Sequence, residues 1–383
     1  MRVRRGLYPQ PGTRYRLAPM VAAVFLATAV LPSFLSSATL APLGPAATAF
    51  LWMALSPPET ARAGRELKKA ESADRVCLDY AWRGPEGSPL SVSVSISRTD
   101  LEESERAFGY VKAELETDLL AREAALRQEE ALSPMAAARR LIARSPFAEF
   151  IEARESEGGE VALVVPEGRP IPAGAGAEVE RLSGRLASAW AASKRKIAAI
   201  LRKRVESYFE AHGLVRVDEG IGVRYDALVR RSLPLVGPIA RELKAMSDRE
   251  LHGRDLEAVL SFVQQIPVAQ VPEEENGRYT TGCRVPLAVL ADDGGDCDSK
   301  AVLFTALWRC LHNFPAVLVM VPEHMLVGVA GSFGDGASVA LDSHRFLLCE
   351  VCSRKPVPPG SISEYSAKSI ARGQVRYKIL GPR

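Results

Sequence analysis

The sequence predicts an α+β fold, in which helices and antiparallel strands form separate groups along the chain. Residues 296–311 have the apolar spacing of a helix, and short strand-like runs follow them between residues 316 and 351. Before residue 220, two long stretches rich in charge repeat apolar residues every three or four positions, as amphipathic helices do. Together these patterns predict a helix packed on a sheet, preceded by a largely helical region.

Composition limits the classes of function. A chain of 383 residues suits two or three domains. The 49 basic and 46 acidic residues are interleaved and give a net charge of only +3, so nothing resembles the clustered basic surface of a nucleic-acid-binding protein. Six cysteines are too few for a disulfide scaffold in a chain of this length. We therefore expect no nucleic-acid partner.

The N-terminal region, residues 1–60, is predicted to target the chain to a membrane. Residues 1–16 contain five arginines and no acidic residue, and no charged residue occurs from Leu17 to Pro58. One helical crossing needs about 20 apolar residues, so the stretch is long enough for two. The candidate spans are residues 17–37 and 40–56.

The number of crossings decides on which side of the membrane the rest of the chain lies. An arginine-rich flank stays in the cytoplasm. One crossing, or a signal peptide cleaved near "ARA" at 61–63, places the remainder outside the cytoplasm, which is the location we expect. Two crossings return it to the cytoplasm, and the basic segment 62–69 favours that alternative.

An accessory region is predicted from residue 70 to 220. The runs "VCLDYAW" and "LSVSVSIS" alternate as strands do and predict a small hairpin. Residues 99–145 have a helical pattern, a short strand and a loop follow at 157–177, and a second long helix is expected at 178–212. Further short helices are expected between residues 225 and 265.

The stretch "GGDCDSKAVLFTALWRCL" at 294–311 contains the first candidate for chemistry. Cys297 lies at the predicted start of a helix, which Gly295 or Asp296 can cap. Unpaired N–H groups and the positive end of the helix dipole favour a thiolate there. A buried structural cysteine is the alternative, since free cysteines are often simply part of a core.

A nucleophilic cysteine needs a base and, usually, an acid that orients the base. His324 opens the strand-like run "HMLVGVA", just after another such run, and is well placed to meet a helix start. Glu350 ends the run "RFLLCE", where an unpaired acid is costly to bury. Asp342 is the alternative acid, although it lies in a predicted turn.

These segments resemble the transglutaminase-like superfamily, which has a papain-like fold. "GGDCDSKAVLFTALW" is similar to its nucleophile helix, "VPEHMLVGV" to its histidine strand, and "RFLLCEV…PVPPGSIS" to its acid segment. Upstream, "VLSFVQQIPVAQVP" is similar to the helix before the nucleophile. The resemblance covers residues 225–365, and leaves 366–383 as a C-terminal tail.

The resemblance implies roles for individual residues. Cys297 is expected to be the nucleophile, His324 the base and Glu350 the orienting acid, with Gln264 as an oxyanion donor. Some relatives hold calcium near the nucleophile, but acidic residues are common at helix starts in any case. The sequence therefore predicts no cofactor and leaves weak calcium candidates at Asp292, Asp293, Asp296 and Asp298.

The expected function is that of a membrane-anchored cysteine peptidase or amidase acting on a protein or peptide. Acyl transfer to an amine, which crosslinks proteins, is the closest alternative. A non-catalytic binding or scaffold module is a second alternative. A third follows from the CxxC spacing of Cys349 and Cys352, which is found in redox and metal proteins.

Overall fold

The computed structural model confirms a mixed α+β architecture with antiparallel sheets. It describes residues 65–84, 86–156, 159–166, 172–218, 220–331, 333–353 and 355–381. The predicted membrane-targeting region, 1–60, lies outside these residues. Within the described ranges, none of the helices is both long and apolar enough to cross a membrane.

The described residues form two compact units. The first unit contains residues 65–110 and 211–381, and the second contains residues 111–210. The predicted accessory region, 70–220, is therefore divided between them. Its hairpin lies in the first unit, together with the segment in which the candidate site was predicted.

The first unit begins with a three-stranded antiparallel sheet in the order β1 (Glu66–Glu71), β2 (Arg75–Arg83) and β3 (Pro89–Ser97). The hairpin of β2 and β3 was predicted, and β1 was missed. Strand β1 has the sequence ELKKAE, and nearly all its side chains are exposed, so it lacks the apolar alternation by which strands are recognised. A charged strand of this kind protects a sheet edge from pairing with other chains.

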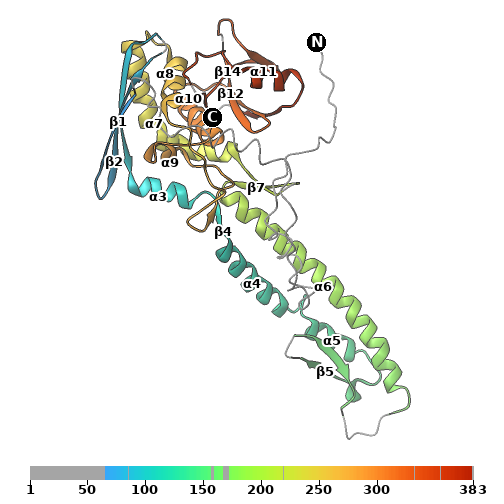
Figure 1. Cartoon of the computed structure of the whole chain (residues 1–383). Coiled ribbons are helices and arrows are strands. Elements are labelled where there is room, and N and C mark those ends of the chain that lie inside the picture. The colour runs from blue at the N-terminus through green and yellow to red at the C-terminus, as the bar shows by residue number, and fades with distance from the viewer. Residues whose placement is uncertain are drawn as a thin grey trace, which may run out of the picture. The chain divides into compact units, whose positions relative to one another are not determined.

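The inward face of this sheet packs on the helices of the same unit (Figure 1). Tyr80 donates a hydrogen bond to the carbonyl of Leu290 at 3.2 Å, and Trp82 donates one to the Ser261 hydroxyl at 3.2 Å. Both rings contact Phe262, at centroid distances of 5.2 and 5.7 Å. Aromatic packing therefore joins the N-terminal sheet to residues about 200 positions later in the chain.

The helix predicted over 99–145 is wrong as a single element. The structure divides it into α3 (Arg98–Arg106), α4 (Lys112–Gln128) and α5 (Pro134–Ile142), with the short strand β4 (Tyr110–Val111) after α3. Gly109 makes the first break, because its φ of 78° lies in the left-handed region and a Cβ there would come within 2.6 Å of the Tyr279 carbonyl. Pro134, capped by Ser133, starts α5.

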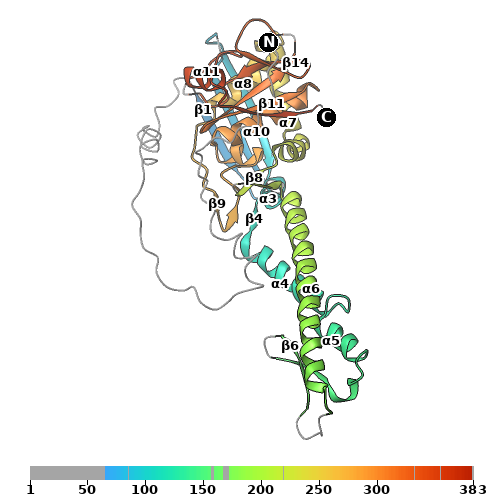
Figure 2. The ribbon, with the colours of Figure 1, turned by 90° about the vertical axis from the view of Figure 1, so that its right-hand side faces the viewer.

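The second unit is built on the long helix α6 (Ala175–Ala211), which confirms the helix predicted at 178–212. A hairpin of β5 (Glu152–Glu155) and β6 (Val161–Val164) follows the short helix η1 (Ala148–Phe150). Figure 2 shows α6 beside α4 and α5. A small apolar core, and an Arg204–Asp118 pair with nitrogen–oxygen distances of 2.8 and 2.9 Å, hold α6 to these elements.

Helices make up most of the middle of the first unit. They are α7 (Tyr225–Glu250), α8 (Asp255–Gln265), α9 (Pro286–Ala291) and α10 (Cys297–Leu311), accompanied by the short hairpins β7 (Leu214–Val217) with β8 (Gly220–Val223) and β9 (Glu274–Glu275) with β10 (Arg278–Tyr279).

Helix α7 is much longer than the short helices predicted for residues 225–265. It continues through Pro234 and Pro238, although proline usually ends or kinks a helix. Helix α7 packs along α10 and α8, and its apolar face is buried there. Burial of that face offsets the hydrogen bonds that the two prolines remove.

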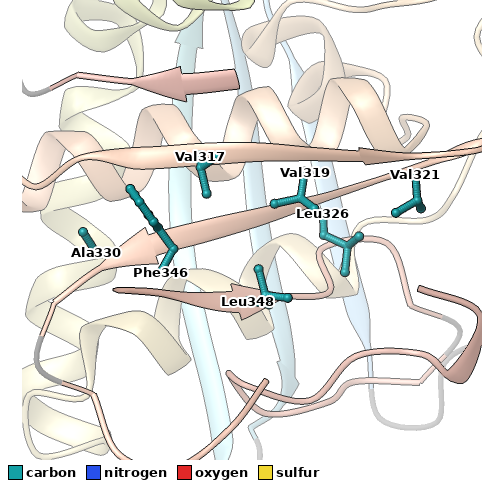
Figure 3. Packing of buried hydrophobic residues seen from close by; sticks show 7 residues of the cluster. All are labelled: Val317, Val319, Val321, Leu326, Ala330, Phe346 and Leu348. Atoms are coloured by element: carbon teal, nitrogen blue, oxygen red, sulfur yellow. The ribbon is translucent and has the colours of Figure 1, made fainter. Parts of the chain in front are cut away.

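A five-stranded antiparallel sheet ends the first unit. Its order is β13 (Ser338–Leu341), β14 (His344–Cys349), β12 (His324–Ala330), β11 (Ala316–Val321) and β15 (Arg376–Leu380). Helix α10 contacts β12, and an apolar cluster formed by β11, β12 and β14 fills one face of the sheet (Figure 3). The strands predicted after residue 316 are confirmed.

The C-terminal tail predicted at 366–383 is largely structured. Helix α11 (Glu364–Ala371) begins just before it, and β15 pairs with β11 along five residues. Ile370, Val375 and Tyr377 pack against the apolar cluster of the sheet. The short, charge-rich sequence of β15 hides this role, since only Tyr377 and Leu380 in it are not exposed.

Candidate active site

Cys297 is the first residue of α10, as the sequence predicted, and Asp296 is the N-cap. The Asp296 carboxylate accepts hydrogen bonds from the backbone N–H of Ser299, at 2.9 Å, and from the Ser299 hydroxyl. The backbone N–H of Lys300 donates a hydrogen bond to the Asp296 carbonyl. The N–H groups of Cys297 and Asp298 precede the first complete helical turn, so the helix itself offers them no carbonyl.

The loop before this helix is tied to the end of α8. The backbone N–H of Ala269 donates a hydrogen bond to the Gly295 carbonyl at 3.1 Å, and the backbone N–H of Gly295 donates one to the Pro267 carbonyl at 3.3 Å. Lys300, which is completely buried, donates from its ammonium to the Ile266 carbonyl at 2.7 Å. This lysine anchors the segment beside the thiol.

The surroundings of the Cys297 thiol favour its protonated form. Burial, followed by the Asp298 carboxylate, the Cys352 thiol and the Asp296 carboxylate, raises the pKa of Cys297 well above its usual range. The thiol donates a hydrogen bond to one oxygen of Asp298 at 3.4 Å, and the other oxygen accepts from the Tyr225 hydroxyl. Burial, and after it the two carboxylates, therefore oppose the thiolate that a helix start favours.

Asp296 is itself perturbed. Burial and the nearby Asp298 carboxylate raise the pKa of Asp296 to about 6, although its hydrogen bonds from Ser299 act in the opposite direction. Burial, and then Asp298, also raise the pKa of Tyr225, so that its phenol remains a donor. Two carboxylates, those of Asp296 and Asp298, therefore lie at the start of α10, and hydrogen bonds donated by Ser299 and Tyr225 hold them in place.

His324 is presented by the tight turn between β11 and β12. Val321 and His324 are paired across that turn, which consists of Pro322 and Glu323. Glu323 has a φ of 57°, a left-handed conformation that is unfavourable for glutamate. The Tyr365 hydroxyl, on α11, donates to the Pro322 carbonyl at 2.9 Å. The turn is thus fixed from both strands and from α11.

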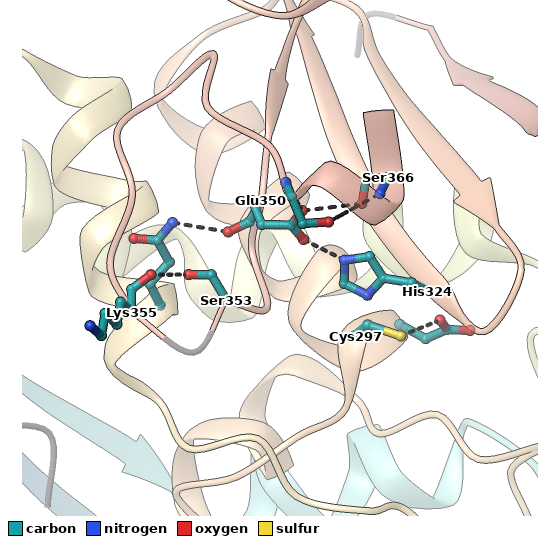
Figure 4. A network of polar contacts seen from close by, with 9 residues as sticks. Cys297, His324, Glu350, Ser353, Lys355 and Ser366 are labelled. Carbon is teal, nitrogen blue, oxygen red and sulfur yellow. Dashed lines mark hydrogen bonds and ion pairs between the residues drawn. The ribbon is translucent and has the colours of Figure 1, made fainter. Parts of the chain in front are cut away.

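His324 lies between Cys297 and Glu350 (Figure 4). Its Nε2 is hydrogen-bonded to Oε1 of Glu350, and its other ring nitrogen is on the side of the Cys297 sulfur. A carboxylate only accepts hydrogen bonds, so this contact assigns the proton of a neutral imidazole to Nε2 and leaves a lone pair on Nδ1. The structure therefore brings together the three residues that the sequence singled out as nucleophile, base and acid.

Glu350 follows the last residue of β14 and is almost fully buried, with 3% of its surface exposed. Its second oxygen, Oε2, accepts from the backbone N–H of Ser363 and from the Ser366 hydroxyl, both at 3.3 Å. Ser363 caps α11 and Ser366 lies in the first turn of that helix. Each oxygen of the buried carboxylate thus has a donor, which is what stabilises its charge in the core.

Gln264 does not have the role that the sequence suggested. Its side-chain nitrogen donates to the carbonyls of Glu350, at 2.9 Å, and Val357, at 3.0 Å, and its oxygen accepts from the N–H of Val357 at 3.2 Å. Both amide hydrogens are used, so none is left for a substrate oxyanion. Gln264 instead holds the backbone of the acid residue and of the loop after it.

The calcium candidates Asp292 and Asp293, and the alternative acid Asp342, do not lie together at one site. Asp292 pairs with Arg284 at 3.2 Å, and Asp293 pairs with Arg65. Across the described part of the chain, no three His, Cys, Asp or Glu side chains are grouped as metal ligands. Asp342 is exposed and lies at the opposite end of β14 from Glu350, at a distance on the order of 20 Å along the strand. It is therefore not the acid that contacts His324.

The two cysteines of the CxxC spacing have different environments. Cys349 is buried in β14, where burial raises its pKa, whereas Cys352 is partly exposed and close enough to influence Cys297. Both are free thiols in the structure. This arrangement does not favour the redox or metal alternative.

Four residues of the site were missed from the sequence. Tyr225, Ser363, Tyr365 and Ser366 come from the first turns of α7 and α11, far from Cys297 in the chain. The "SISEYS" stretch at 361–366 has the serine pattern of a helix start, which was the one available signal. No model of a known protein family matches this chain, and no curated protein or solved structure matches it significantly.

Proposed function

We propose that this protein is a thiol-dependent amide hydrolase, most simply a peptidase, with Cys297 as nucleophile. The observation that carries the proposal is the position of His324 between the Cys297 thiol and the buried Glu350 carboxylate (Figure 4). A nucleophile, a base and an orienting acid that lie close together are the arrangement that favours nucleophilic attack on a carbonyl. We also propose that residues 225–365 have the transglutaminase-like fold that their motifs resemble.

In this mechanism the thiol carries its proton before attack, because burial raises the pKa of Cys297. As the sulfur attacks the amide carbonyl carbon, the thiol proton passes to Nδ1 of His324. Glu350 accepts the Nε2 proton in a hydrogen bond and stabilises the imidazolium that forms. The N–H groups of Cys297 and Asp298 are suited to stabilise the oxyanion.

Collapse of the tetrahedral intermediate breaks the carbon–nitrogen bond. The imidazolium of His324 gives its proton to the leaving amine, and a thioester on Cys297 remains. Water then attacks the thioester, with His324 again accepting a proton, and the acid product leaves as the thiol is restored. If an amine replaces water in this second half, the product is a new amide, and the protein is a crosslinking acyltransferase.

A mixture of defined peptides tests the proposal. The full chain, purified in a neutral detergent, is incubated with the peptides and the products are read by mass spectrometry. A fluorescent primary amine, added in parallel, becomes incorporated only if acyl transfer occurs. We expect cleavage by the wild type and none by Cys297→Ala or His324→Ala, with unchanged thermal unfolding. Equal cleavage by Cys297→Ala would refute a thiol enzyme.

One observation favours the second candidate function, a non-catalytic binding module. The thiol donates to Asp298 and carries a raised pKa, as an unreactive buried cysteine does. In that case iodoacetamide labels Cys297 at the same slow rate in the wild type and in His324→Ala. Faster labelling in the wild type at neutral pH is expected only if His324 removes the proton.

We further propose that the uncharged segment 17–58 anchors the chain in the cell membrane and that the catalytic unit lies outside the cytoplasm. A protease added to intact spheroplasts tests the location. Digestion of the catalytic unit is expected, whereas protection until the cells are lysed would indicate two crossings and a cytoplasmic site.

A further inference from the structure

A cavity of about 490 Å³ lies in the first unit, away from the thiol. Trp308 and His312 line it, and they lie at the end of α10 that is opposite from Cys297. Trp308 is about 17 Å along the helix axis from Cys297, at 1.5 Å per residue. The start of α8 and residue Leu347 of β14 also line the cavity. Its volume lies in the range of small-molecule sites.

Aromatic rings form one side of this cavity. Trp308 and His312 have centroids 4.3 Å apart, and His312 is stacked on Phe314 at 6.2 Å with an interplanar angle of 11°. Phe333 completes the group at 6.3 Å from Trp308. Phe314 has 50% of its surface exposed, which is unusual for phenylalanine. The ring faces carry partial negative charge, which attracts cations.

Carboxylates outnumber cations on the other side. The described lining includes the acids Asp255, Glu257 and Asp335 and the single guanidinium of Arg254. That guanidinium pairs with Glu257 at 3.0 Å and with Glu86, outside the lining, at 2.8 Å. Asp255 is hydrogen-bonded to His312, with 3.1 Å between Oδ2 and Nε2. The lining therefore has a net negative charge when His312 is neutral.

Two buried polar atoms on lining residues lack a well-formed hydrogen bond within the described part of the chain. They are Oδ1 of Asp255, whose residue is 7% exposed, and the indole Nε1 of Trp308. The ammonium of Lys244 lies 3.5 Å from Oδ1 of Asp255, too far for a strong charged hydrogen bond. Buried polar atoms without partners are uncommon and often mark a functional site. These two atoms therefore indicate that the cavity is a binding site for a ligand.

We propose that this cavity binds a small organic cation, an ammonium group carried on an aromatic or apolar body. The body packs against Trp308, Phe314 and Phe333, and the ammonium lies between a ring face and the carboxylates of Asp255 and Glu257. Negative charge and ring faces together favour a cation over a neutral molecule of the same shape, and exclude an anion. The site is separate from the thiol and does not require Cys297 to be reactive.

A set of three fluorinated probes of matched shape tests the proposal. They are para-fluorophenethylamine, the corresponding phenylethanol and the corresponding phenylpropionate, each titrated with the full-length Cys297→Ala protein in a neutral detergent and followed by fluorine NMR. We expect the amine to bind with a dissociation constant of about 0.1 to 1 mM, as befits a small ligand. The alcohol should bind about tenfold more weakly, and the carboxylate should not bind.

Two lining variants and two controls locate the binding. Phe314→Ser and Glu257→Gln should each weaken amine binding by about tenfold. Leu120→Ser is the control for an exposed apolar residue, and Glu123→Gln is the control for a helical glutamate paired with an arginine one turn away. Both controls should bind as the parent protein does.

Three results would overturn the proposal. They are the absence of amine binding, equal binding of the amine and the alcohol, and binding that is unchanged in Phe314→Ser and Glu257→Gln. The last result would mean that the amine enters the detergent or another site. Because the parent protein lacks the thiol, none of these outcomes depends on whether Cys297 is catalytic.

Discussion

Oε1 of Glu350 is hydrogen-bonded to Nε2 of His324. Oε2 of the same carboxylate accepts hydrogen bonds from the backbone N–H of Ser363 and from the Ser366 hydroxyl. A glutamine at this position must turn its NH₂ group toward one side or the other. If the NH₂ group is turned toward Ser363 and Ser366, it meets two groups that also donate, and it is left without an acceptor. Toward His324, it donates to Nε2, so the imidazole proton moves to Nδ1 and His324 can no longer accept the thiol proton.

We therefore expect Glu350→Gln to lower the rate of Cys297 alkylation at pH 7 by about 10- to 100-fold, as loss of a positioned base does. The unfolding free energy should fall by about 1–3 kcal/mol, because a buried donor is left unpaired. Ser366→Ala removes one donor and keeps the carboxylate, so its alkylation rate should remain within a few-fold of wild type. A wild-type rate in Glu350→Gln would show that the acid does not orient His324.

Asp298 controls the thiol directly. Asp298→Asn removes a negative charge next to Sγ, and the pKa of Cys297, which that charge raises, should fall. The pH profile of iodoacetamide labelling, read by peptide mass spectrometry, should move to lower pH. Tyr225→Phe is the matched control, since it removes the donor on the other oxygen of Asp298 and keeps the charge. It should not move the profile to lower pH, and a shift equal to that of Asp298→Asn would argue against an electrostatic cause.

Asp296 predicts a specific dependence of stability on pH. Folding raises its pKa from the usual 3.8 to about 6, so the folded chain binds this proton more tightly than the unfolded chain. The contribution of Asp296 to the unfolding free energy is fully present below the pKa that it has in the unfolded chain. It is lost as the pH rises through the folded-state pKa of about 6.

Asparagine keeps the N-cap and cannot ionise. Asp296→Asn should therefore stabilise the protein at pH 8 by on the order of 2 kcal/mol, and the gain should vanish near pH 4. Urea unfolding of both proteins across this range measures the difference. A gain that stays constant with pH would mean that ionisation of Asp296 is not the cause.

Gln264 separates a structural role from a catalytic one. Its three hydrogen bonds join α8 to the backbone at Glu350 and Val357, so Gln264→Ala should lower the unfolding free energy by about 2–4 kcal/mol. An oxyanion donor would instead lower the turnover rate without loss of stability. Comparing turnover with urea unfolding decides between the two, and full stability in Gln264→Ala would restore the oxyanion role.

The turn before His324 contains measurable strain. Glu323 has a φ of 57°, so Glu323→Gly should raise the unfolding free energy by about 1 kcal/mol. The same substitution at the first residue of a helix, Glu364→Gly in α11, should instead lower it by up to about 1 kcal/mol. If Glu323→Gly is destabilising, the left-handed conformation is not the dominant cost at this turn.

The parts of the fold that could be predicted are those in which local pattern and tertiary environment agree. Helix α10 and the strands around His324 have strong apolar periodicity, and the cap at Asp296 lies in the sequence itself. Strand β1 and strand β15 have little such periodicity, because each lies at a sheet edge. The length of α7 depends on packing that local signals, including its two prolines, argue against.

The site shows the same division. The residue types at Cys297, His324 and Glu350 and their order in the chain could be inferred, whereas the burial of the thiol could not. The environment of the thiol depends on Asp298 lying beside Sγ while it is hydrogen-bonded to Tyr225, which is 73 positions away in the chain. A helix start alone favours a thiolate, whereas burial in the folded protein, followed by the charge of Asp298, opposes it.

The first unit is interrupted in the chain by the whole of the second unit. During synthesis, Trp82 leaves the ribosome 179 positions before its hydrogen-bond partner Ser261. At 5–20 residues per second this delay is roughly 10 to 40 s, long compared with the collapse of a small chain. Until then the helices that cover the apolar face of the N-terminal sheet have not been made, so this face is a surface that a chaperone would cover on the nascent protein.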